Sequence, residues 1–171
     1  MRLLALIGLF AIVVAIAAAV FAFGGFYSVA ATEAESDPVA WILIRVRQAA
    51  IERHASAASP PVALDDPAVV QAGARAFAAR GCPACHGAPG VAWAKFSEAM
   101  QPDPPDLKEV AAHVPPSQIF WVVRNGIKMT GMPGFSAIGV DDKEIWSITA
   151  FVKNLPKVSD ADYKIWTASG G

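Results

Sequence analysis

The stretch Cys82-Pro83-Ala84-Cys85-His86 carries the strongest structural signal in this sequence. It follows the pattern C-x-x-C-H, which is an attachment sequence for a c-type haem. The spacing lets two thiols add across the two vinyl groups of the haem, and the adjacent histidine then lies under the iron as its proximal ligand. Because Cys82 and Cys85 are the only 2 cysteines in the chain, the motif accounts for every thiol. We therefore expect one covalently bound haem c.

Two other uses of a C-x-x-C pair fit the sequence less well. A thioredoxin-like redox pair is typical of an α/β pattern, and the chain shows no such pattern. A zinc site needs a second pair of cysteine or histidine ligands at suitable spacing, whereas His54 and His113 are isolated. The haem interpretation is therefore favoured over both.

A second axial ligand is expected in the loop Met129-Thr130-Gly131-Met132-Pro133, which follows His86 in the chain. A methionine thioether there gives His/Met ligation, which raises the reduction potential of the iron. We favour Met132 over Met129 because it lies between a glycine and a proline, in a stiff loop with room to approach a flat ring. His113 is a more distant alternative. The expected iron ligands are therefore His86 and Met132.

The N-terminal part of the chain has the length and composition of a membrane anchor. Residues 3–23 are 21 residues of Leu, Ile, Val, Ala, Phe and Gly. As a helix they span about 31 Å, close to the roughly 30 Å thickness of the hydrocarbon core of a bilayer. A secretory signal usually has a shorter apolar core of about 7–15 residues, so an uncleaved anchor is expected. The small residues 28–30 keep a cleaved signal as the alternative.

Charges on either side of this span predict its orientation. Arg2 precedes the span, and Glu33, Glu35 and Asp37 follow it. Positive residues stay on the cytoplasmic side of a membrane. The N-terminus is therefore expected in the cytoplasm and the bulk of the chain in the periplasm, at the inner membrane of a bacterium.

The overall composition excludes some classes of partner. Hydrophobic residues make up 54% of the chain and charged residues 17%, with a formal net charge of -1. No basic patch suggests nucleic acid, and no acidic tail suggests a basic partner. The expected partners are the lipid bilayer and redox proteins.

An amphipathic helix is expected between the span and the haem-binding part. Asp37 can cap it, with Pro38 at its first position. Arg45, Gln48 and Glu52 lie elsewhere on this helix. It is expected to contact the membrane surface or a partner subunit, with packing on its own domain as the alternative. Apolar residues recur along it at steps of three and four, at Val39, Ile42, Leu43, Val46 and Ala50.

The rest of the chain is predicted to be all-α, with long loops. Asp66-Pro67 can begin one helix, Gly126 can end another, and Pro156 can end the last. Prolines interrupt the middle of the chain and make long strands there improbable. The expected organisation is an anchor (1–31), an amphipathic helix and linker (32–64), a haem domain (65–158) and a C-terminal tail (159–171).

Residues 66–157 resemble a class I cytochrome c domain, and residues 1–58 resemble the leader of a membrane-anchored, mono-haem bacterial version. The resemblance rests on the C-x-x-C-H motif and on Gly131-Met132-Pro133. In that family the first and last helices cross through a small residue and an aromatic one. The residues that match this crossing are Gly73 and Phe77 in the first helix, and Ile148 and Phe151 in the last.

Two further residues are expected at the haem. The resemblance implies that the carbonyl of Pro105, in Pro105-Asp106-Leu107, accepts a hydrogen bond from His86 and orients it. The doubled Pro104-Pro105 departs from the usual pattern, so the neighbouring proline is the alternative. Arg124 precedes the methionine loop and is interpreted either as the partner of a haem propionate or as part of a solvated helix face.

Electron transfer is the expected function, with no catalysis by the chain itself. The amphipathic helix favours a fixed electron-transfer subunit of a membrane oxidoreductase or oxidase complex, because a simple tether does not need it. The alternative within this class is a free tethered shuttle. A haem peroxidase is less well supported, because it needs an open sixth position and a methionine is available to fill it. A gas sensor of the helical-bundle type is also disfavoured, because such cytochromes carry the attachment motif near the C-terminus and 85 residues follow His86 here.

Overall fold

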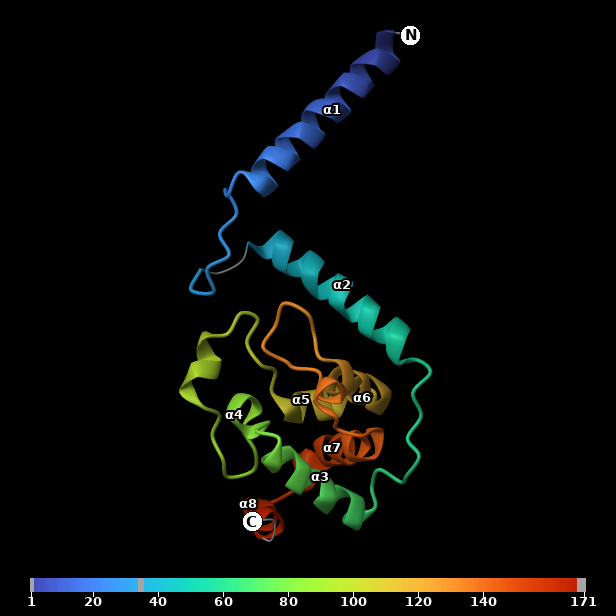
Figure 1. Ribbon diagram of the computed structural model, residues 1–171, viewed down its shortest axis with the longest axis vertical. Coiled ribbons are helices and arrows are strands. Elements are labelled where there is room, and N and C mark those ends of the chain that lie inside the picture. Colours follow the sequence, from blue (N-terminus) through green and yellow to red (C-terminus); the bar gives the residue numbers. More distant parts are fainter. Residues whose placement is uncertain (1, 34–35, 169–171) are drawn as a thin grey trace. The chain divides into compact units, whose positions relative to one another are not determined.

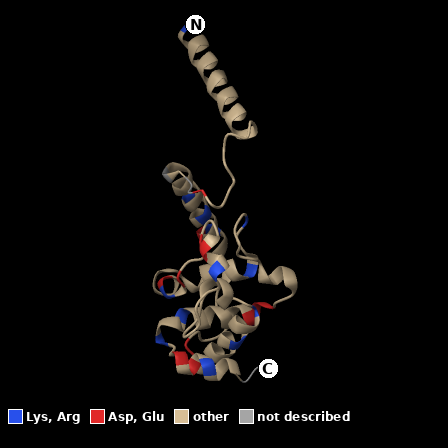
Figure 2. Cartoon of the chain, turned by 90° about the vertical axis from the view of Figure 1, so that its left-hand side faces the viewer, with Lys and Arg blue, Asp and Glu red and all other residues tan. Residues whose placement is uncertain are grey.

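The computed structural model describes residues 2–33 and 36–168, and the chain separates into two compact units, residues 1–34 and 35–171. The first unit consists mainly of one helix, α1 (Arg2–Phe23), none of whose residues is buried. Figure 2 shows no charged residue along α1 beyond its start. By length and composition alone, α1 is a helix that can cross a membrane.

The second unit is built from helices, and no strand occurs among its described residues. The predicted all-α fold is therefore confirmed (Figure 1). Three short 3-10 turns lie between the helices: η1 (Lys95–Ala99), η2 (Phe135–Ile138) and η3 (Leu155–Lys157). The helices are α2 (Asp37–Ala55), α3 (Pro67–Ala79), α4 (Pro83–His86), α5 (Leu107–His113), α6 (Pro116–Asn125), α7 (Asp142–Asn154) and α8 (Asp160–Ala168).

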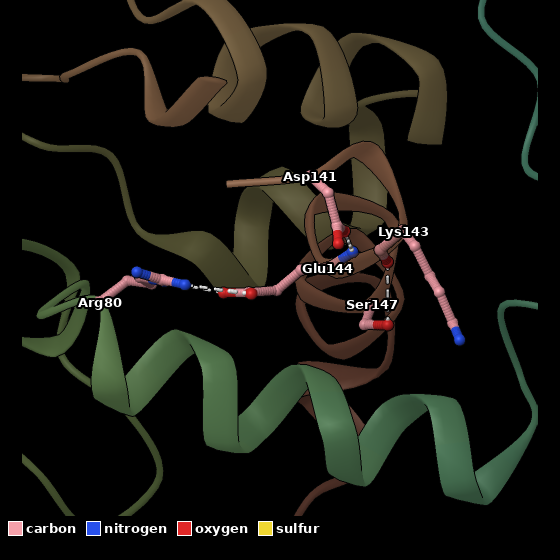
Figure 3. Close-up of polar contacts among 5 residues, drawn as sticks. All are labelled: Arg80, Asp141, Lys143, Glu144 and Ser147. Carbon is pink, nitrogen blue, oxygen red and sulfur yellow. Dashed lines mark hydrogen bonds and ion pairs between the residues drawn. The ribbon is translucent and has the colours of Figure 1, made fainter. Parts of the chain in front are cut away.

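Aspartate side chains begin three of these helices. Asp66 accepts a hydrogen bond from the backbone N–H of Ala68 at 2.8 Å, directly before the proline that opens α3. Asp106 caps α5 in the same way at 2.7 Å. Asp141 caps α7 by accepting from the N–H of Glu144 at 2.7 Å (Figure 3). Each carboxylate satisfies an N–H group that the first helical turn leaves without an intrahelical partner.

The centre of the second unit is the crossing of α3 and α7 (Figure 1). A Cβ atom added to Gly73 would overlap with the backbone carbonyl of Ser147, so only glycine lets the two helices approach this closely. One turn further on, the rings of Phe77 and Phe151 lie 5.2 Å apart with an interplanar angle of 56°. The crossing expected from the resemblance is present, through the expected glycine and aromatic residues.

An ion pair joins the same two helices at the surface. Arg80, which follows the last residue of α3, donates from Nε to Glu144 Oε1 at 2.7 Å and from Nη2 to Oε2 at 3.1 Å (Figure 3). These hydrogen bonds raise the pKa of the Arg80 guanidinium. The pair fixes the end of α3, immediately before the cysteine motif, against the start of α7.

Two segments outside the expected haem domain also pack on it. In α8, Tyr163 is buried and its ring stacks on Phe151 at 5.6 Å, so the expected tail contains a helix that joins the core. At the end of α2, Ala55 is fully buried and His54 stacks on Trp121 of α6 at 5.9 Å. The second unit is therefore larger than the predicted haem domain.

Candidate haem site

The cysteine motif forms one short turn of helix, α4, which follows shortly after the end of α3. The N–H groups of Cys85 and His86 both donate to the carbonyl of Cys82, at 3.2 and 3.0 Å, which winds the chain into a turn. Residues three apart in such a turn lie on the same side, so Cys82 and Cys85 present their thiols together. Both are free cysteines and half-buried. This is the thiol pair that attachment at two vinyl groups requires.

The thiol of Cys82 lies in an apolar setting. Its side chain packs against the hydrophobic core, and burial raises its pKa to about 12. Desolvation disfavours the charged thiolate, which is the physical cause of this rise. The attachment site is therefore at the edge of the core and not at the polar surface.

The ring of His86 is oriented by a backbone carbonyl. Its Nδ1 lies 3.2 Å from the carbonyl oxygen of Pro105. A carbonyl oxygen can only accept, so Nδ1 carries the proton and Nε2 keeps its lone pair free for a metal. Burial lowers the pKa of His86, and the hydrogen bond to Pro105 opposes this effect. The ring of His86 is thus oriented by the carbonyl of Pro105, the proline named from the sequence.

The methionine loop is closed by backbone and side-chain hydrogen bonds. The N–H of Ile127 donates to the carbonyl of Met132 at 3.1 Å. The hydroxyl of Thr130 donates to the carbonyl of Ile127 at 2.8 Å and accepts from the N–H of Met132 at 3.2 Å. The loop starts at Gly126, whose φ of +68° suits glycine and whose backbone lies against that of Gly134. These contacts fix where the Met132 backbone lies.

The two methionines of this loop have different surroundings. Met132 is half-buried and packs against the core. Met129 is 98% exposed and has a φ of +59°. His113 is exposed at the end of α5, where its Nδ1 lies 3.1 Å from the carbonyl of Glu109. Of these three alternatives, only Met132 combines burial with contact to the core.

Residues 68–152 match the family model described as Cytochrome C oxidase, cbb3-type, subunit III. This chain carries a c-type cytochrome domain. The match runs from α3 to α7 and includes both the cysteine motif and the methionine loop, while α1, α2 and α8 lie outside it. No curated protein and no solved structure shows a significant match to the chain. Haem-based electron transfer is the activity that this cytochrome domain supports.

The residues of the cytochrome domain fit a haem c. The donor set comprises a pair of free thiols on one turn, a histidine with an unprotonated Nε2, and a thioether in a closed loop. The side chains of Cys82 and Met132, far apart in sequence, both pack against the same apolar core. A mostly apolar wall is what a porphyrin ring needs, because the core then excludes water from the iron. Buried members of that core include Leu107, Ile119, Phe120, Val123 and Phe135.

Arg124 lies at the end of α6, close in sequence to the methionine loop. Its Nε pairs with Asp142 Oδ1 at 2.8 Å, and its carbonyl accepts a hydrogen bond from Ser136 at 2.7 Å. The sequence interpretation included neither partner. Both contacts tie α6 to the segment that follows the methionine loop. A role of Arg124 toward a propionate stays a prediction.

Two residues beside the methionine loop were missed by the sequence interpretation. Thr130 closes the loop through its hydroxyl, and its position two residues before Met132 is a signal for such a turn. Met100 packs with its side chain against Gly131. Nothing in the sequence near Met100 indicates this contact, since 30 residues lie between Met100 and Gly131.

Proposed function

We propose that the cytochrome domain carries a single haem c, bound covalently through Cys82 and Cys85, with His86 and Met132 as the axial ligands of the iron. Such a group supplies one-electron redox chemistry when bound. The chain contributes the covalent attachment, the two ligands and an apolar wall that tunes the potential. Pro105 orients His86 through its carbonyl. The Nε atom of Arg124 already donates to Asp142. The two terminal amino groups of its guanidinium are therefore the candidate donors to a haem propionate.

The observation that supports this proposal most strongly is the geometry of the cysteine motif. Cys82 and Cys85 are both free and half-buried on one turn, and His86 directly follows with Nδ1 held by a carbonyl. A redox-active disulfide pair does not require a histidine fixed in this way. A proximal haem ligand does, because the bond to Nδ1 sets the tautomer and the orientation of the ring.

We place the cytochrome domain in the periplasm of a bacterium, anchored to the inner membrane by α1. The length of α1 and its freedom from charge after Arg2 support the anchor. The single basic residue before the span and the acidic Glu33 after it support a cytoplasmic N-terminus.

We propose that the chain works as the electron-transfer subunit of a membrane oxidoreductase or oxidase complex, and that it performs no catalysis itself. The description of the matching family model, which names a subunit of a cytochrome c oxidase, supports this role. The alternative is a free tethered shuttle that moves electrons between separate complexes.

Extraction in a gentle detergent through a C-terminal tag separates these two roles. A complex subunit co-purifies in fixed stoichiometry with other oxidase or dehydrogenase subunits, which mass spectrometry identifies. A redox titration of the haem-loaded chain, separated from any partner subunits, must show one reversible one-electron step. Recovery of the haem protein alone, in several detergents, would mean that it is a shuttle. Absence of a reversible step would contradict electron transfer itself.

A further inference from the structure

One face of α2 holds the helix on the cytochrome domain. Ala40, Arg47 and Ile51 are half-buried, and Ala55 is fully buried. These residues follow one another at steps of seven, four and four, so they lie on one side of the helix. The stack of His54 on Trp121 joins the same end of α2 to α6. The C-terminal half of α2 is therefore fixed to the domain.

A different face of α2 is apolar and uncovered. Its large members Ile42, Leu43 and Val46 are 52, 52 and 63% exposed. They are spaced three and four residues apart, and Ala49 and Ala50 continue the row. We refer to Ile42, Leu43, Val46, Ala49 and Ala50 as the free stripe. Within the part of the second unit that the structure describes, all five are exposed.

The residues beside the free stripe suit the surface of a lipid bilayer. Trp41 is 61% exposed, and the guanidinium of Arg45 lies over its ring at 5.7 Å from the centroid. Tryptophan is enriched at the level of lipid headgroups, and arginine there keeps its charge in the polar layer. Between Asp37 and Glu52 the only charged residues are Arg45 and Arg47. Arg47 belongs to the face that packs on the domain, so the exposed part of α2 presents apolar residues and the cation of Arg45. This combination complements an anionic lipid surface.

The chain itself keeps α2 near a membrane. Only residues 24–36 separate the end of α1 from the start of α2. Fully extended, a segment of this length spans at most about 45 Å, at roughly 3.3–3.6 Å per residue. If α1 crosses a bilayer, as the proposed function holds, α2 cannot move far from that surface.

We propose that the free stripe of α2 lies in the headgroup region of the bilayer, as a second membrane contact in addition to the α1 span. This inference rests on the proposed anchor. Because α2 is fixed to α6, the contact also fixes how the cytochrome domain faces the membrane. The domain is then held in one orientation to the membrane, and it does not tumble freely on a tether.

The test uses the full-length, haem-loaded protein with one added cysteine, either Val46→Cys on the free stripe or Gln48→Cys as the matched control. Both positions are exposed, so neither substitution disturbs the core. Each variant is placed at low protein density in vesicles of phosphatidylethanolamine and phosphatidylglycerol, which contain no other protein. The rate of reaction with a polar, membrane-impermeant maleimide is then measured. We expect Val46→Cys to react several-fold more slowly than Gln48→Cys.

Three results would overturn the inference. Equal rates in the pure lipid vesicles would show that lipid does not cover the stripe. Protection of Val46→Cys only at high protein density would identify a second copy of the chain as the occupant. Protection only in native membranes would identify a partner subunit. For both variants we also record whether the protein floats with the vesicles and whether its haem spectrum is intact. Loss of flotation would reveal failure of the anchor, and loss of the haem spectrum would reveal failure of the haem site.

Discussion

At the scale of single residues, the candidate site depends on a few atoms held by hydrogen bonds. The carbonyl of Pro105 selects the tautomer of His86, and the hydroxyl of Thr130 closes the loop that carries Met132. Neither contact touches a metal directly. Both determine where a ligand atom lies, and such supporting contacts strongly affect how well a metal is held.

The choice between the two loop methionines leads to a first prediction. Met132→Ala removes the half-buried thioether, so we expect a lower reduction potential and a sixth position that binds added imidazole. Met129→Ala removes a fully exposed side chain and should change neither property. A redox titration and an imidazole titration of both variants provide the measurement. Equal effects, or the reverse order, would show that Met132 is not the ligand.

Thr130 provides a second prediction about the same loop. Thr130→Val keeps the shape of the side chain but loses both hydrogen bonds, which contribute about 1 kcal/mol each. We expect weaker methionine–iron binding. As the pH is raised, the near-infrared charge-transfer band of the ferric variant should disappear at a lower pH than that of the wild type. Thr130→Ser keeps the hydroxyl and is the control. Identical pH titrations of the Thr130→Val and Thr130→Ser variants would contradict the proposed role of the hydroxyl.

At the scale of helices, the crossing of α3 and α7 is the main structural element of the cytochrome domain. It brings together Gly73 with Ser147 and Phe77 with Phe151. The cysteine motif begins directly after α3, and the Arg80–Glu144 pair fixes this end of the helix to α7. The position of the attachment site therefore depends on how closely the two helices pack.

A third prediction tests that close approach. Gly73→Ala adds a methyl group that overlaps with the Ser147 carbonyl, so the helices must move apart. Overpacking of this kind costs about 1–3 kcal/mol. Chemical denaturation of the holoprotein should show a loss of stability in this range. Ala79→Ser, at an exposed position of the same helix, is the control, and an equal loss in both variants would refute this account of the crossing.

Sequence reasoning predicted the longer helices, but it predicted neither α5 nor α8, and it predicted the packing only partly. The all-α class and the start of α3 at Asp66-Pro67 follow from local patterns, so they could be predicted. The apolar stripe of α2 was also visible in the sequence. The face of α2 that packs on the cytochrome domain was not visible in the sequence. Its members Ala40, Arg47 and Ile51 include a charged residue and form no apolar pattern.

At the scale of the whole molecule, the chain combines an apolar helix with a second unit that is larger than the cytochrome match. α8 adds Tyr163 to the core, and α2 adds its buried end. From the sequence, the segment 159–171 was predicted to be a tail, because it lies beyond Pro156, where the last predicted helix ends. Contacts between residues distant in sequence, such as that of Met100 with Gly131, leave no local signal. For the same reason, the sequence predicted the candidate site residues and, through the resemblance, the contact of Pro105 with His86, but not the contacts of Thr130 and Met100 in the methionine loop.

A fourth prediction concerns the contribution of the haem to this unit. Small domains bury too little apolar surface to be very stable alone, and a bound group stabilises the folded state to which it binds. Replacing both Cys82 and Cys85 by Ala should abolish covalent haem and lower the unfolding temperature of the second unit. Circular dichroism of the wild-type and double-variant proteins measures this. An unchanged unfolding temperature would show that the core folds independently of the haem.

The central claim is that Cys82 and Cys85 hold one haem by covalent bonds. Intact mass spectrometry tests it most directly, using full-length protein produced in a bacterium that attaches haem to c-type cytochromes and then denatured in acid. The account predicts the mass of the chain plus one haem, and the mass of the chain alone when both cysteines are replaced by alanine. A wild-type mass without haem, with two thiols still free to alkylate, would contradict it.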